Sequence, residues 1–186
     1  KYKSSIYAYI NDNKIDLPKG EPGVEEWLVL VQKFPRTLLL APKAIQTKEM
    51  ILSAVEQEGL TVQFANEELV DINVAYAAIQ QNVESIAFIP ISVLDEDLIV
   101  KAVSSEGLLL SHVADQLQTE TIALAAVKSD GMSLEFVRSD LRTETVCTVA
   151  FESNASSLAF APLGNWNKER ALLAAKATDN PNIYRA

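Results

Sequence analysis

A 24-residue period runs through most of the chain and constrains its fold more than any other feature. Periods of about 20–50 residues indicate an array of small stacked units rather than one large core. One column of this repeat contains alanine in six successive units, and a column ten residues later is mainly aromatic. A third column contains Thr, Asp or Asn, the residue types preferred at helix N-caps. The three columns are Ala54, Ala78, Ala102, Ala126, Ala150 and Ala174; Phe64, Phe88, His112, Phe136, Phe160 and Tyr184; and Thr47, Asp71, Asp95, Thr119, Thr143 and Asn167.

The first half of each unit predicts an amphipathic helix. Apolar residues follow the cap at the third, fourth, seventh and eighth positions, as in Met50, Ile51, Ala54 and Val55. This spacing is typical of one helix face. The alanine column would allow two helix axes to approach closely. We expect this helix to span about eleven residues and to end at a C-terminal glycine such as Gly59.

The second half of each unit predicts a shorter helix, over residues 60–69 and 132–141 in the best-formed units. We expect its aromatic residue, for example Phe64 or Phe136, to pack between neighbouring helix pairs as part of the core. A unit this small cannot bury both of its faces and must stack on its neighbours. The sequence therefore predicts an all-α fold, an α-solenoid of stacked 24-residue helix–turn–helix repeats.

The period also divides the chain. Residues 1–22 lie outside the repeat and predict an N-terminal capping helix and loop. The repeat domain is expected over 23–186. Its units are 23–46, 47–70, 71–94, 95–118, 119–142, 143–166 and a partial unit at 167–186. Because the chain starts without methionine and stops inside a unit, we expect it to be part of a longer protein.

One unit carries a family resemblance. Residues 119–141 read TETIALAAVKSDGMSLEFVRSDL, with an acidic start, an A-A-V core, a K-x-x-G end and an L-x-F-V-x-x-x-L segment. This pattern resembles the helical-repeat family catalogued as domain of unknown function 4116. The matching residues are Ala125, Ala126, Val127, Lys128, Gly131, Leu134, Phe136, Val137 and Leu141. Units over about residues 47–186 follow the pattern, with departures such as His112 at the aromatic site. The resemblance implies helical repeats and no assigned chemistry, and some such proteins belong to bacteria that live in eukaryotic cells.

Composition excludes several classes of function. With 16 Lys and Arg against 25 Asp and Glu, the net charge is −9. This charge argues against nucleic acid and anionic membranes as partners. No apolar run approaches the roughly 20 residues that span a bilayer. The sequence contains no phosphate loop, dinucleotide fingerprint, nucleophile elbow or zinc-protease motif, so we expect no cofactor and no metal.

Two residues with catalytic potential are better explained by packing. His112 is the single histidine and occupies the aromatic column, which predicts a core or half-buried spacer. Cys147 is the single cysteine and occupies an apolar column, which predicts a buried thiol. A whole unit separates them, so they are not expected to form a nucleophile–base pair. We predict that the chain is not an enzyme.

The units that depart from the repeat supply the candidate site. Three units have proline two residues after the aromatic position: Pro42, Pro90 and Pro162. We expect proline there to shorten or bend the second helix. Ile91 and Leu163 follow two of these prolines at a mostly polar position, and Trp166 comes next. Either these side chains repack inward, or they form exposed apolar anchors for a partner, a role in which Trp is enriched. We select Ile91, Leu163 and Trp166 as candidate partner-binding residues.

Three functions remain open at the level of sequence. The leading hypothesis is a non-enzymatic scaffold in the cytoplasm that presents a surface to a protein or peptide partner. The alternative is a docking or scaffold domain of an enzyme, including a secreted bacterial effector in the host cytosol, with its catalytic domain outside this sequence. The third is a hydrolase that uses carboxylates on the repeats. A groove with an exposed aromatic residue would support the first, and a deep pocket with two facing acids would support the third.

Overall fold

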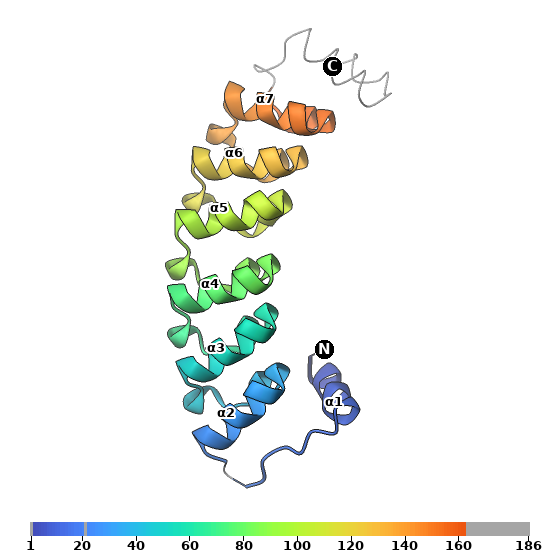
Figure 1. Cartoon of the computed structure of the whole chain (residues 1–186). Helices are drawn as coiled ribbons and strands as arrows, with labels where there is room; N and C mark the ends of the chain where they lie inside the picture. The colour runs from blue at the N-terminus through green and yellow to red at the C-terminus, as the bar shows by residue number, and fades with distance from the viewer. Residues whose placement is uncertain (1, 21, 163–186) are drawn as a thin grey trace. The chain divides into compact units, whose positions relative to one another are not determined.

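The computed structural model describes residues 2–20 and 22–162, which form two compact units divided between Val93 and Leu94 (Figure 1). The fold is an all-α repeat fold, and the described residues contain no β-strand. The division falls one residue before the 95–118 repeat begins.

The described residues of the N-terminal unit form four α-helices and six short 3-10 helices. The α-helices are α1 (Tyr2–Asp12), α2 (Val24–Lys33), α3 (Lys48–Gln57) and α4 (Ile72–Gln81). The 3-10 helices are η1 (Pro35–Leu39), η2 (Lys43–Ile45), η3 (Gly59–Phe64), η4 (Glu67–Leu69), η5 (Val83–Phe88) and η6 (Ile91–Val93).

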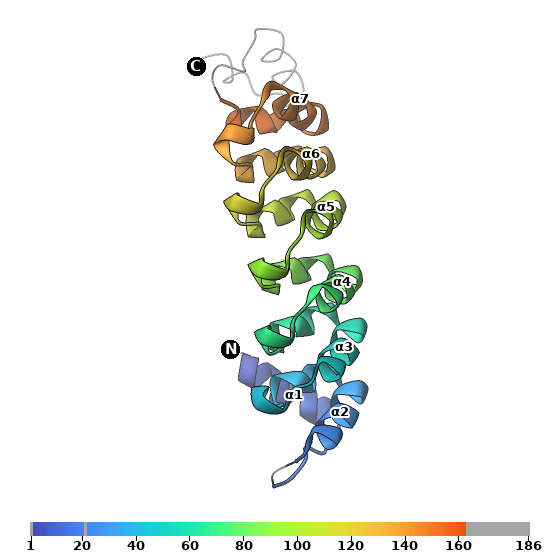
Figure 2. The same ribbon diagram turned by 90° about the vertical axis from the view of Figure 1, so that its left-hand side faces the viewer.

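The described part of the C-terminal unit continues the same plan. Its α-helices are α5 (Glu96–Ser105), α6 (Glu120–Ser129) and α7 (Glu144–Ser153). Its 3-10 helices are η7 (Gly107–His112), η8 (Asp115–Leu117), η9 (Gly131–Phe136), η10 (Ser139–Leu141) and η11 (Ala155–Phe160). Within each unit the repeat α-helices lie side by side, and the 3-10 helices form a second layer against them (Figures 1 and 2).

The first half of the repeat is confirmed. Five predicted cap residues accept a hydrogen bond from a first-turn N–H through their side chains: Thr47, Asp71, Asp95, Thr119 and Thr143. The predicted apolar stripe is the core, and Met50, Ile51, Ala54 and Val55 are fully buried. Local capping and a 3.6-residue period are therefore sufficient to place these helices.

The second half of the repeat is not the predicted α-helix. Each fully described repeat has a 3-10 helix of five or six residues and then a three-residue one, as in η3 and η4. A 3-10 helix has three residues per turn, so residues three apart share a side. Val62 and Ala65 are accordingly buried. Phe64 and Phe136 are only half-buried, so the prediction that the aromatic column belongs to the core was wrong.

The glycines that follow the α-helices have a different role from the predicted one. Gly59, Gly107 and Gly131 do not adopt the left-handed conformation of a C-terminal glycine; among described glycines only Gly20 has a positive φ. A Cβ atom on Gly59 would lie 2.4 Å from the carbonyl oxygen of Ala78 in the next repeat. Gly107 approaches Ala126 in the same way. Glycine is required because two backbones nearly touch there.

The prolines are not the cause of the break in the second segment. The short 3-10 helix is a separate element in repeats with proline and in those without it. Asn66, Ala114 and Arg138 precede it with φ values of −66°, −61° and −53°, close to the −56° of Pro42. Because this φ lies in the range that proline imposes, proline fits the position without bending the chain.

Candidate functional site

A groove lies in the second layer of the N-terminal unit, along the 3-10 helices of three successive repeats. Its volume is about 670 Å³, and its walls include Lys43, Val62, Gln63, Glu67, Phe88 and Ile91. We call it the Phe88–Ile91 groove after its two most exposed large apolar side chains. Phe88 is 42% exposed and Ile91 is 50% exposed.

The local helix type explains why Phe88 does not share the buried side of η5. In η5 and the residue after it, Ile86 and Ile89 are three apart, and both are buried. With three residues per turn, Phe88 lies on a different side of η5 from that pair, and Ile91 begins the separate helix η6. Pro90 lies between them and follows Ile89, whose backbone is extended. The groove therefore has an apolar wall that the core does not use.

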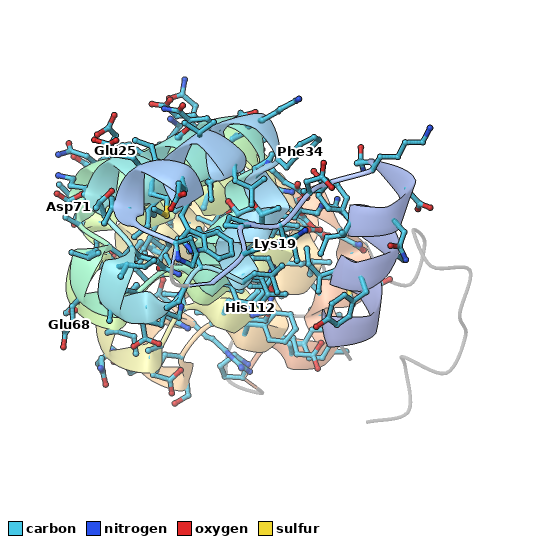
Figure 3. The ribbon with its side chains drawn as sticks, turned by 90° about the horizontal axis from the view of Figure 1, so that it is seen from below. Lys19, Glu25, Phe34, Glu68, Asp71 and His112 are labelled. Carbon is cyan, nitrogen blue, oxygen red and sulfur yellow. The ribbon has the colours of Figure 1, made fainter. Side chains whose placement is uncertain are left out.

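Charged groups border the groove. The Lys43 ammonium donates hydrogen bonds to the backbone carbonyls of Phe64 and Ala65. Partial burial lowers the pKa of Lys43, which the nearby Glu67 carboxylate opposes. Glu67 and Glu68 are exposed, and Figure 3 shows Glu68 at the outer edge of the unit. Because Glu67 and Glu68 outnumber the single ammonium of Lys43, the charged groups that line the groove have a net negative charge.

The structure places one of the three predicted site residues in the groove. Ile91 faces the groove and is exposed, so inward repacking does not describe it. Leu163 and Trp166 lie outside the described residues. Phe88 was not selected from the sequence, because its column was assigned to the core. A signal was present, since Ala87 and Ile91 are apolar where neighbouring repeats have polar residues.

The two residues with catalytic potential lie in unlike environments. His112 is exposed, which corrects the prediction of a core or half-buried spacer. Cys147 is fully buried as predicted, and its thiol donates a weak hydrogen bond to the Arg142 carbonyl at 3.6 Å. Within the described residues, no group of three or more His, Cys, Asp or Glu side chains has an arrangement suited to a metal ion.

The carboxylates with resolved shifts remain ionised at neutral pH. The hydrogen bond from Lys48 is the main cause of the lowered pKa of Asp71, with N–H groups of the α4 cap adding to it. Arg138 lowers the pKa of Asp140 in the same way. A general acid requires the opposite shift, a pKa raised towards neutrality. These carboxylates are typical of surface ion pairs and helix caps.

No helix in the described part of the chain has both the length and the apolar character needed to cross a membrane. This finding concerns residues 2–20 and 22–162.

Comparison with known proteins assigns the chain to a family. The family model described as "Domain of unknown function (DUF4116)" matches residues 47–93 and 95–142. Each match covers about two of the 24-residue repeats. No curated protein and no solved structure matches the chain. Because the two matches together cover half of the sequence and follow the observed repeat boundaries, the chain belongs to the DUF4116 family.

Proposed function

We propose that this protein is a non-enzymatic helical-repeat scaffold and that the Phe88–Ile91 groove is its surface for a protein or peptide partner. The observation that carries this proposal is the exposure of Phe88 and Ile91 in one open groove of about 670 Å³. Protein-binding sites are centred on aromatic and aliphatic anchors, with a polar rim around them. The groove has both parts, because Glu67 and Glu68 border its apolar wall.

The shape of the groove favours a polypeptide over a small metabolite. Metabolite sites enclose most of their ligand and converge a few polar groups on it. The Phe88–Ile91 groove is open, and the Lys43 ammonium is already bound to backbone carbonyls. A side chain projecting from a partner would bury Phe88 and Ile91 without a deep cavity.

The test is an unbiased peptide-display selection on the full chain, repeated on a chain with Phe88→Ser and Ile91→Ser. We expect selected peptides to bind the unmodified chain and to lose at least about tenfold in affinity on the double variant. The matched control is Val29→Ser, since Val29 is 65% exposed in the same unit but outside the groove. Peptides that bind all three chains equally would contradict the proposal.

We further propose that this role is carried out in the cytoplasm, or in the host cytosol if the protein is a secreted effector. The support is the single cysteine of the sequence, which leaves the chain without an internal disulfide, as is usual for proteins of a reducing compartment. Fractionation of cells that express the tagged full-length protein tests the location. Recovery outside the cytosolic fraction would contradict it.

A further inference from the structure

The α1 helix shows how the second layer of this fold accepts another helix. Ile6 and Ile10 lie one turn apart on one face of α1, and only 4% and 8% of their surface is exposed. Leu30, Leu39 and Leu40 are among the partly buried side chains that pack against them. Helix α1 thus packs against α2 and η1 through an apolar cluster to which Ile6 and Ile10 contribute two of the buried side chains.

A cation–π contact lies beside the apolar cluster that α1 packs against. The Arg36 guanidinium lies over the Tyr9 ring, 5.3 Å from its centroid. Arg36 also pairs with Glu58 of the next repeat at 2.7 Å. Figure 3 shows Phe34, another member of this cluster, between α2 and α1.

Equivalent positions of successive repeats contact α1 in one place and line the Phe88–Ile91 groove in another. Leu40, Phe64 and Phe88 are separated by 24 residues each. Leu40 packs against the α1 isoleucines, and Phe64 lines a small pocket together with Ile6. Phe88 has no such cover and is 42% exposed. Helix α1 therefore lies against Leu40 and close to Phe64, whereas Phe88 remains exposed.

The covered and open parts of the layer are continuous. Gln63 lines the pocket beneath α1 and also lines the Phe88–Ile91 groove. A second helix placed on the groove would thus extend a surface that already binds a helix. The rims differ, since Arg36 borders α1 whereas Glu67 and Glu68 border the groove.

We infer that the Phe88–Ile91 groove binds an amphipathic helix of a partner protein, with two aliphatic side chains one turn apart and an adjacent lysine or arginine. This inference rests on the proposed function and names the class of partner. The aliphatic pair covers Phe88 and Ile91 as Ile6 and Ile10 of α1 cover Leu40. The basic residue pairs with Glu67 or Glu68.

The probe is a labelled peptide with the sequence of α1 that carries Asn11→Lys and Asp12→Lys. A hydrocarbon staple on the face opposite the isoleucines holds it helical, because so short a helix is marginal in water. Fluorescence anisotropy with the full chain measures its affinity. We expect saturable binding that weakens about 30-fold with Phe88→Ser and Ile91→Ser, the loss expected for a hot spot. The single variant Ile91→Ser, at a half-exposed site, is the second readout if the double variant is unstable.

Charge provides an independent arm of the test. The double variant Glu67→Lys with Glu68→Lys should lower the affinity for the peptide and reduce the salt dependence of its binding. The matched control is Glu49→Lys with Glu56→Lys on α3, which makes the same charge change at exposed sites outside the groove. Equal effects of the two pairs would overturn the assignment of the basic residue to this rim.

Two further outcomes separate this inference from the proposed function. An unstapled peptide with Ala8→Pro cannot form a continuous helix. If it binds the groove as well as the stapled peptide, the partner is not a helix and the inference fails, while the proposed function stands. If stapled-peptide binding is insensitive to Phe88 and Ile91, the inference fails as well. If display also yields no groove-dependent peptide, both fail.

Discussion

The side-chain amide of Gln46 joins two successive repeats by binding the backbone of Asn66. Its Oε1 accepts a hydrogen bond from the Asn66 N–H at 2.7 Å, and its Nε2 donates to the Phe64 carbonyl at 3.1 Å. Gln118 makes the same pair of bonds to Arg138 and Phe136, at 2.8 and 3.0 Å. Both glutamines are buried. Each satisfies backbone groups that would otherwise be costly to bury.

A proline at the position of Asn66 has no N–H and therefore needs no hydrogen-bond acceptor from the preceding repeat. Pro90 stands where Asn66 stands, and it has no N–H to donate. The residue that corresponds to Gln46 in the preceding repeat is then Val70, which is buried and apolar. The presence of proline in one repeat thus accompanies the loss of the acceptor in the repeat before it.

The first prediction tests this pairing with a double-mutant cycle on Gln46→Val and Asn66→Pro. Each single change leaves a buried polar group without its partner, so each should lower the free energy of unfolding by about 1–3 kcal/mol. The double variant recreates the Val70–Pro90 pair and should cost about 1 kcal/mol less than the sum. The Asn66 φ of −66° accepts proline. Urea denaturation measures all four chains, and strict additivity would show that the two residues are not coupled.

The second prediction concerns the contact between backbones at Gly59. The Cβ of Gly59→Ala would meet the Ala78 carbonyl oxygen, so the repeats must separate, at a cost of about 1–3 kcal/mol or more. Gly23→Ala is the matched control, because its Cβ would have no neighbour closer than 4.0 Å. The control should stay within about 0.5 kcal/mol of wild type. Thermal unfolding compares them, and equal melting temperatures would contradict the close-approach explanation.

The third prediction compares the stability contributions of Leu134, which is buried, and Phe136, which belongs to the aromatic column. Leu134 is fully buried, so Leu134→Ala should cost about 2–5 kcal/mol. Phe136 is half-buried, and Phe136→Ala should cost less than Leu134→Ala because less apolar area is lost. Equilibrium denaturation of both variants measures this order. A larger loss for Phe136→Ala than for Leu134→Ala would indicate that the aromatic side chain belongs to the core after all.

The fourth prediction concerns the pH dependence of the Asp71 cap. Its pKa lies below the ordinary 3.8, mainly through the hydrogen bond from Lys48. A carboxyl with a lowered folded-state pKa contributes stability above its unfolded pKa. That contribution disappears as the pH falls through the folded value. Lys48→Gln should therefore move the Asp71 pKa upward, measured by NMR titration of its carboxyl carbon.

A second variant isolates the charge of Asp71 from its role as a cap. Asn is as good an N-cap as Asp, so Asp71→Asn keeps the cap and removes the charge. We expect the variant to lose less stability than wild type between neutral pH and acid below about pH 4. Both side chains of the ion pair are 44% exposed, so high salt should reduce the difference. An unchanged acid transition would show that the ion pair does not contribute.

The candidate site was only partly accessible from the sequence. Ile91 could be selected because an apolar residue interrupts a mostly polar column, and the structure places it in the groove. Phe88 could not, since aromatic residues at a constant repeat position are usually core. Its exposure depends on helix type, and a six-residue segment is too short for periods of 3.0 and 3.6 residues to be told apart.

The sequence by itself determined the period, the caps and the buried stripe of the α-helices. Thr47 and Met50, for example, act within one turn of one helix, and such local interactions are written in neighbouring residues. Tertiary structure alone decided the rest. Gly59 is glycine because of a carbonyl 19 residues away, and Gln46 is buried because of an N–H 20 residues away. These distances cross the boundary between repeats, and only stacking brings the groups together.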